Sequence, residues 1–206
     1  MFNNNQKENI NMSNIKYREE WLNTVAEELD KVAFKPNGHK LPPVKISCSW
    51  ALGNRAKNKK TLGQCFPTCW SDGKINEIVI VPTVEDSFEI ADTLAHELAH
   101  AVDDCKSGHG KGFKDICLAV GLDGNSQMRY AAAGEKLGDQ IKAIIKKVGE
   151  YPHDKMNISD RKKQTTRNLK VECSSCGFGW RASKTMIMQM TNTTCNGCGS
   201  DTLEIV

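Results

Sequence analysis

Apolar residues recur along much of the chain at intervals of three and four positions, which is the spacing of an amphipathic helix. The first such run begins near Ser13 and ends at the turn Pro36-Asn37-Gly38. Its apolar positions are Ile15, Trp21, Leu22, Val25, Leu29 and Val32. The same spacing predicts three further helices, over residues 86–102, 113–122 and 133–149. The N-terminal helix is expected to pack on a sheet and to have no catalytic role.

Three short segments between the first two predicted helices have the composition and boundaries of strands. They cover residues 44–50, 61–66 and 77–81. We expect them to form a small antiparallel sheet that leads into the next helix, where Asp86 or Ser87 supplies the N-cap. This order of elements predicts an α+β domain.

The predicted helix over residues 86–102 carries the most specific motif in this part of the chain. Its sequence is His96-Glu97-Leu98-Ala99-His100. Side chains four positions apart lie on the same face of a helix, so the two imidazoles can each offer a nitrogen to one Zn²⁺. Glu97 directly follows the first histidine, and we expect it to take a proton from water rather than to bind the metal.

A catalytic zinc takes a third protein ligand and keeps one position open for water. We favour His109, because Gly108 and Gly110 give the backbone the freedom to turn the imidazole back toward the helix. Asp103 and Asp104 are alternative ligands, since they follow the second histidine closely. Two solvated histidines are the competing explanation, but three of the five histidines in the chain lie between positions 96 and 109.

A second metal site is predicted near the C-terminus from two Cys-x-x-Cys pairs. Cys173 and Cys176 form the first pair, and Cys195 and Cys198 follow after eighteen residues. Four thiolates can close a tetrahedral structural zinc site, and metal binding would supply the folding energy of so short a segment. The five remaining cysteines are expected to be free buried thiols, although the spacing of Cys65 and Cys69 also suits a metal.

Seven side chains are candidate nucleic-acid contacts because lysine and arginine neutralise phosphates and aromatic rings stack on bases. They are Arg55, Lys57, Lys59 and Lys60, between the first two predicted strands, and Trp180, Arg181 and Lys184, between the cysteine pairs. A solvated loop and a covered ribbon surface are the plainer explanations. The net charge of +3 is too small to decide between them.

The histidine motif and the segment after it resemble the SprT-like metalloproteases, the family related to Spartan. The resemblance rests on His96-Glu97-x-x-His100-Ala101 and Gly108-His109-Gly110-x-x-Phe113. It implies a zincin-like domain with a C-terminal zinc ribbon, three histidine ligands to a catalytic zinc, and Glu97 as the general base. It also implies DNA, single-stranded or damaged, as an activating partner, and proteins bound or crosslinked to DNA as substrates.

The domain organisation predicted from these features has four parts. They are a disordered N-terminus over residues 1–13, a SprT-like domain over 14–153, a basic linker over 154–170 and a zinc ribbon over 171–206. No apolar run approaches the roughly 18 residues of a membrane helix, and no signal peptide is readable at the N-terminus. We therefore expect a cytoplasmic protein without a membrane partner, and the sequence leaves its oligomeric state open.

The function predicted from the sequence is a zinc-dependent endopeptidase with one catalytic and one structural zinc, acting in DNA repair. Two alternatives stay open. One is a DNA- or protein-binding adaptor whose first zinc is structural, and the other is a zinc hydrolase acting on a non-peptide bond. An intact Glu97 argues against the adaptor, because a purely structural site does not need a base.

Overall fold

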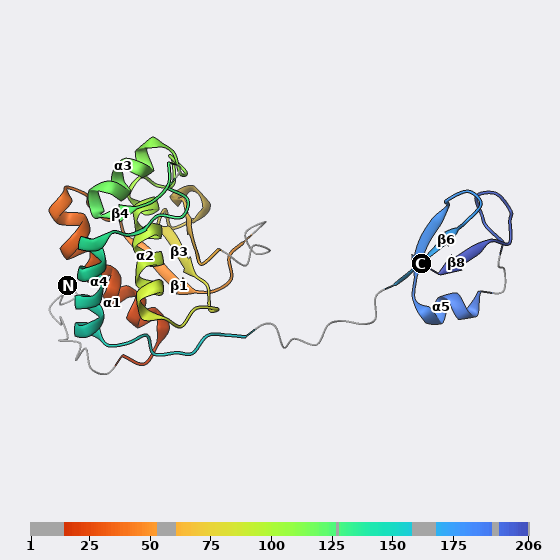
Figure 1. Cartoon of the computed structure of the whole chain (residues 1–206), viewed down its shortest axis with the longest axis horizontal. Coiled ribbons are helices and arrows are strands. Elements are labelled where there is room, and N and C mark those ends of the chain that lie inside the picture. The colour runs from red at the N-terminus through yellow and green to blue at the C-terminus, as the bar shows by residue number, and fades with distance from the viewer. Residues whose placement is uncertain (1–14, 53–60, 127, 158–167, 191–193, 206) are drawn as a thin grey trace, which may run out of the picture. The chain divides into compact units, whose positions relative to one another are not determined.

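The computed structural model describes residues 15–52, 61–126, 128–157, 168–190 and 194–205. The chain divides into two compact units, Met1–Ile158 and Ser159–Val206, and each is described by itself. Together they have the predicted α+β composition, with helices and a small sheet followed by a cysteine-rich module (Figure 1). No helix among the described residues has both the length and the apolar character needed to span a bilayer.

The first helix of unit 1, α1 (Arg18–Leu29), buries one apolar face, as its sequence spacing predicts. Trp21, Leu22, Val25 and Leu29 are fully buried on this face. The chain continues through a π-helical segment, Asp30–Phe34, and a 3-10 turn, Lys35–Asn37. Gly38 ends this run with a φ of 80°, a left-handed conformation that favours glycine.

The sheet of unit 1 is mixed rather than antiparallel. Its strands are β1 (Val44–Cys48), β2 (Gly63–Phe66) and β3 (Asn76–Ile80), in the order β1-β3-β2. The antiparallel prediction is confirmed for β2 and β3 and is wrong for β1 and β3, which run parallel. The connection between β1 and β2 is long enough for the two strands to lie apart in the sheet. The apolar β3 lies between them, and β2 is an edge strand.

Three helices follow the sheet: α2 (Ser87–Val102), α3 (Lys111–Val120) and α4 (Glu135–Val148). Asp86 caps α2, because its side chain accepts a hydrogen bond from the Glu89 N–H at 2.8 Å. A short antiparallel ladder, β4 (Leu122–Asp123) with β5 (Ala132–Ala133), separates α3 from α4.

The helices and the sheet of unit 1 form three layers around one core. Helices α1 and α2 contact each other and cover one face of the sheet, and α4 packs on both of them (Figure 1). The Trp21 indole N–H donates to the Gly149 carbonyl at 2.9 Å, which ties α1 to the segment after α4. That segment extends beyond the predicted end at residue 153, since the Met156 N–H donates to the Pro82 carbonyl at 2.7 Å.

The described residues of unit 2 form a three-stranded antiparallel ribbon with one short helix. Its strands are β6 (Leu169–Cys173), β7 (Gly179–Ala182) and β8 (Leu203–Ile205), in the order β7-β6-β8. Helix α5 (Lys184–Gln189) follows β7, and the Ser183 hydroxyl caps it by accepting from the Met186 N–H. Strand β6 begins inside the stretch that the sequence assigns to the linker.

Candidate metal centres

Helix α2 and the turn after it bring His96, His100 and His109 together. One nitrogen of each ring lies within 4.8 Å of the others. The ring centroids of His96 and His100 are 5.1 Å apart, and those of His100 and His109 are 4.8 Å apart. Tetrahedral bonds of about 2.0–2.1 Å put zinc-bound nitrogens roughly 3.4 Å from each other, so small side-chain movements would let the three rings share one ion.

Burial keeps the His96 ring in the neutral form that a metal requires. Burial and the neighbouring His109 lower the pKa of His96 to about 4, against a hydrogen bond with the Ala131 backbone that acts in the opposite sense. The neutral ring keeps one nitrogen with a free lone pair when the other carries the proton. A backbone carbonyl that accepts from the second nitrogen also fixes the ring orientation, as is common for metal-binding histidines.

The turn before α3 returns the third histidine to α2. Gly108 has a φ of 52°, which a residue with a side chain adopts only with strain. A Cβ on Gly110 would lie 2.9 Å from the Ser107 carbonyl oxygen, so this position also has no room for one. Phe113, buried in α3, stacks on His100 with a centroid distance of 3.9 Å and an interplanar angle of 14°.

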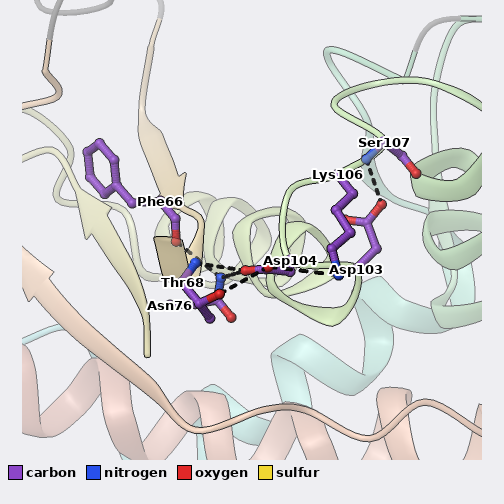
Figure 2. A network of polar contacts seen from close by, with 7 residues as sticks. All are labelled: Phe66, Thr68, Asn76, Asp103, Asp104, Lys106 and Ser107. Atoms are coloured by element: carbon purple, nitrogen blue, oxygen red, sulfur yellow. Dashed lines mark hydrogen bonds and ion pairs between the residues drawn. The ribbon is translucent and has the colours of Figure 1, made fainter. Parts of the chain in front are cut away.

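The two rival ligands of the sequence analysis are engaged in fixing the turn after α2 (Figure 2). The Asp104 carboxylate accepts from the Thr68 N–H at 2.7 Å, from the Thr68 hydroxyl at 3.0 Å and from the Asn76 amide at 3.0 Å. These bonds, the Thr68 N–H first, lower the pKa of Asp104. Asp103 accepts from the Ser107 N–H at 3.0 Å. Neither aspartate belongs to the histidine group.

Glu97 and the three histidines line a cavity of about 680 Å³ that runs along α2. Edge strand β2 forms one wall, from Gly63 to Phe66, and Trp70, Arg129 and Tyr130 also contribute to the lining. Glu97 is only 6 % exposed, and its side chain lies against β2. A metal, a carboxylate and the backbone of an edge strand would therefore meet in one cavity.

The wall residues of this cavity have no signature in the sequence that marks them as part of a site. Trp70, in a 3-10 turn, and Tyr130, in the loop before β5, are exposed aromatic side chains, and the chain has no local pattern that ties them to the histidines. Gly63 is the exception, because an isolated glycine in a strand often marks the close approach of another chain segment.

The four cysteines of unit 2 also form a group that could hold one ion. The sulfurs of Cys173 and Cys198 are 3.7 Å apart, and those of Cys176 and Cys195 are 3.6 Å apart. Two tetrahedral Zn–S bonds of about 2.3 Å place their sulfurs roughly 3.8 Å from each other, which agrees with this spacing. Hydrogen bonds from Ser200 and then Thr202 lower the pKa of Cys173 to about 5 and favour its thiolate.

The other five cysteines are free thiols, and their burial varies more than predicted. Cys65 and Cys117 are buried, and burial raises the pKa of Cys117 to about 12. A hydrogen bond with Cys105, followed by burial, raises the pKa of Cys65. The prediction of burial is wrong for Cys69, which lies in an exposed 3-10 turn, Thr68–Trp70. In the described part of the chain, Cys65 and Cys69 belong to neither candidate metal group.

The predicted nucleic-acid contacts divide between described and undescribed parts of the chain. Arg55, Lys57, Lys59 and Lys60 lie outside the described residues. Trp180 and Arg181 lie on β7, and Lys184 begins α5. Arg181 and Lys184 are exposed, whereas Trp180 is half-buried with its ring centroid 6.0 Å from that of Phe178.

A helix with histidines four positions apart, an intervening glutamate, an adjacent edge strand and a third returning histidine is the arrangement of a candidate zincin-like metal site. The chain belongs to the SprT-like family, whose model matches residues 22–131, from α1 to the loop before β5. This family is associated with zinc metalloprotease activity. Comparisons with curated proteins and with solved structures gave no match.

Proposed function

We propose that this protein is a zinc-dependent endopeptidase. The observation that carries the proposal is the meeting of His96, His100 and His109 beside buried Glu97, in a cavity walled by an edge strand. Membership of the SprT-like family supports the same reaction class. The three histidines would hold the ion. Zinc held there would supply Lewis-acid chemistry, polarising the scissile carbonyl and lowering the pKa of water toward about 7.

Peptide binding would use the edge of β2 that faces the cavity. An extended peptide can add to an edge strand through main-chain hydrogen bonds, which do not depend on its side chains. The strand Gly63–Phe66 has β3 on one side and the cavity on the other. A substrate paired with β2 would therefore pass directly over Glu97 and the histidines.

Glu97 would act as the general base and then as the acid. Its carboxylate would take a proton from the attacking water and pass it to the leaving amine. Its burial shields it from bulk water, so hydrogen bonds and charges act on it more strongly than they would at the surface. The walls of the cavity would hold the peptide in place and exclude competing water.

DNA is proposed as the activating partner, and DNA-bound or DNA-crosslinked proteins as the substrates. The support comes from the family resemblance and from two kinds of side chain on the ribbon, the exposed Arg181 and Lys184 and the paired aromatic rings of Phe178 and Trp180. Side chains of these kinds suit single strands, in which bases are free to stack.

The decisive experiment compares the parent protein with the Glu97→Gln variant. The glutamine keeps the size of the side chain but cannot accept the proton at neutral pH. We expect a loss of peptide cleavage by at least about 100-fold, with unchanged zinc content and DNA binding. Cleavage of a DNA-bound protein is measured with and without single-stranded DNA.

The same experiment separates the alternative functions. An adaptor would show no hydrolysis in the parent protein, and the substitution would change none of its binding properties. A hydrolase for another bond would cleave an ester or amide that is not a peptide, and would leave protein substrates intact. Parent-level proteolysis by Glu97→Gln would overturn the proposed role of this carboxylate.

A further inference from the structure

The first residue of β2 touches the side chain of the proposed general base. A Cβ added to Gly63 would lie 2.8 Å from Glu97 Cγ, 2.8 Å from Glu97 Oε1 and 2.9 Å from Thr93 Cγ2. Real Cβ atoms essentially never approach other heavy atoms to less than 3.0 Å. The absence of a side chain at Gly63 is therefore what lets the edge strand lie directly on this part of α2.

The strand has little freedom to move away from the helix. Gly63 is paired in register with Ile80 of the central strand. One residue earlier, the Leu62 carbonyl accepts from the Val81 N–H at 2.9 Å. One residue later, the buried Gln64 side chain accepts from the Leu52 N–H at 2.9 Å. A substituent at Gly63 would have to displace side chains on α2 instead.

Of the two side chains on α2, Glu97 is the one that would move. Thr93 is β-branched and has a restricted χ1 on a helix, so its methyl group has few other positions. The Glu97 carboxylate ends a longer chain with three rotatable bonds, and it faces the cavity. An added methyl group at Gly63 would therefore push the carboxylate out of its present position beside the histidines.

We infer that Gly63 is a positioning residue for catalysis, because its bare backbone forms the surface against which the Glu97 carboxylate is set. This inference rests on the proposed function of Glu97. Gly63 itself contributes no reacting group. Its effect is geometric, and displacement of a catalytic group by about 1 Å can lower a rate about 100-fold.

The test is the Gly63→Ala variant, assayed on a peptide substrate with zinc present. We expect kcat to fall about 10- to 100-fold, while KM changes less than about threefold and the zinc content stays at the parent value. A loss of packing alone would lower the amount of folded enzyme and leave kcat per folded, zinc-loaded molecule at the parent value.

Gly138→Ala is the matched control. Gly138 is buried in α4, where an added Cβ would meet nothing closer than the Phe88 ring at 3.7 Å, an ordinary contact. Activity and zinc content of this variant should equal those of the parent. If Gly63→Ala folds poorly, a double variant that also carries Thr93→Ser is tested. It lacks the Thr93 Cγ2 methyl group and so loses that clash, but it keeps the clash between the alanine Cβ and Glu97. That double variant should fold, bind zinc and remain slow.

Two outcomes would overturn the inference. One is a parent-like kcat in Gly63→Ala. The other is that Gly63→Ala and the double variant both lose their zinc and no longer unfold cooperatively. Failure of the proposed function looks different. In that case the parent protein itself cleaves no peptide, and Glu97→Gln has no effect to compare. If the parent protein is active, Glu97→Gln is inactive and Gly63→Ala is fully active, the inference about Gly63 is wrong and the proposed function of the protein stands.

Discussion

Burial on α2 favours the neutral form of two side chains. One is a histidine, which is charged when it binds a proton, and the other is an aspartate, which is charged when it loses one. His96 has its pKa lowered to about 4, chiefly by burial. Asp92, one helical turn earlier, has its pKa raised from 3.8 to about 6, again chiefly by burial. Its Oδ1 atom accepts from the Ala133 N–H at 2.7 Å, so the carboxylate has a structural hydrogen bond but no cation partner within ion-pair distance among the described residues.

Replacing Asp92 by asparagine should stabilise the protein near neutral pH. A raised pKa means that the folded chain binds this proton more tightly than the unfolded chain, so the free energy of unfolding falls as pH rises from about 4 to about 6. The substituted amide would keep the oxygen that accepts from Ala133 and would carry no charge. We expect a gain of about 1–3 kcal/mol at pH 7.5, measured by chemical denaturation, and no gain near pH 4.

The control for this prediction is Glu89→Gln, which removes a carboxylate from an exposed position earlier on the same helix. It should change the stability by less than about 0.5 kcal/mol at either pH. An Asp92→Asn variant that is no more stable than the parent at pH 7.5 would show that burial does not destabilise this carboxylate.

Single residues differed in how far the sequence could place them. His96, Glu97 and His100 follow one another within a helical turn, so helix geometry alone puts the histidines on one face. His109 had two aspartate rivals, and only the folded structure separates them, because Asp104 contacts Thr68 and Asn76 and Asp103 contacts Ser107. The contact of Gly63 with Glu97 joins residues far apart in the chain, and no periodicity encodes it.

At the scale of elements, the N-terminus of α2 offers a direct test of helix capping. Asp86→Ala removes the acceptor for the Glu89 N–H and leaves that donor without its capping bond. We expect the free energy of unfolding to fall by about 1 kcal/mol, measured by chemical denaturation, with no change in zinc content. The histidines lie more than two turns further along the helix, beyond the fraying of its first turn.

Asp86→Asn serves as the matched control, because its amide oxygen can accept the same bond. It should retain most of the stability that alanine loses. Equal stability of the alanine variant and the parent would mean that tertiary contacts, and not the cap, hold this end of α2.

The elements themselves could be predicted well from the chain, and their pairing could not. Helix α2 has a cap, a periodic apolar face and a motif, all within local sequence. The position of β3 between β1 and β2 depends instead on burial. Ile78 and Ile80 are almost completely buried, and the central position of a sheet provides neighbours on both sides. Chain order alone would pair β1 with β2 as a hairpin, but the connection after β1 is long and β1 pairs with β3 instead.

At the scale of the whole molecule, the two units obtain their stability in different ways. Unit 1 has a large apolar core built from helices α1, α2, α3 and α4 and the sheet. Among the described residues of unit 2, the buried hydrophobic ones are Val171, Ala182 and two of the candidate metal ligands, Cys173 and Cys195. We therefore expect so small a core to depend on a metal for its fold.

Cys173→Ser should therefore separate the two units experimentally. Cys173 is 1 % exposed and ends β6, and its sulfur is 3.7 Å from that of Cys198. We expect metal analysis to fall from two zinc equivalents per chain to one, and protease to cut freely within residues 159–206 while unit 1 resists. Cys69→Ser is the control, since this exposed thiol of unit 1 belongs to neither candidate metal group and its loss should leave both equivalents. If Cys173→Ser retains two zinc equivalents, the ribbon thiols do not form a closed zinc site. If it loses both, the two metal centres are not independent.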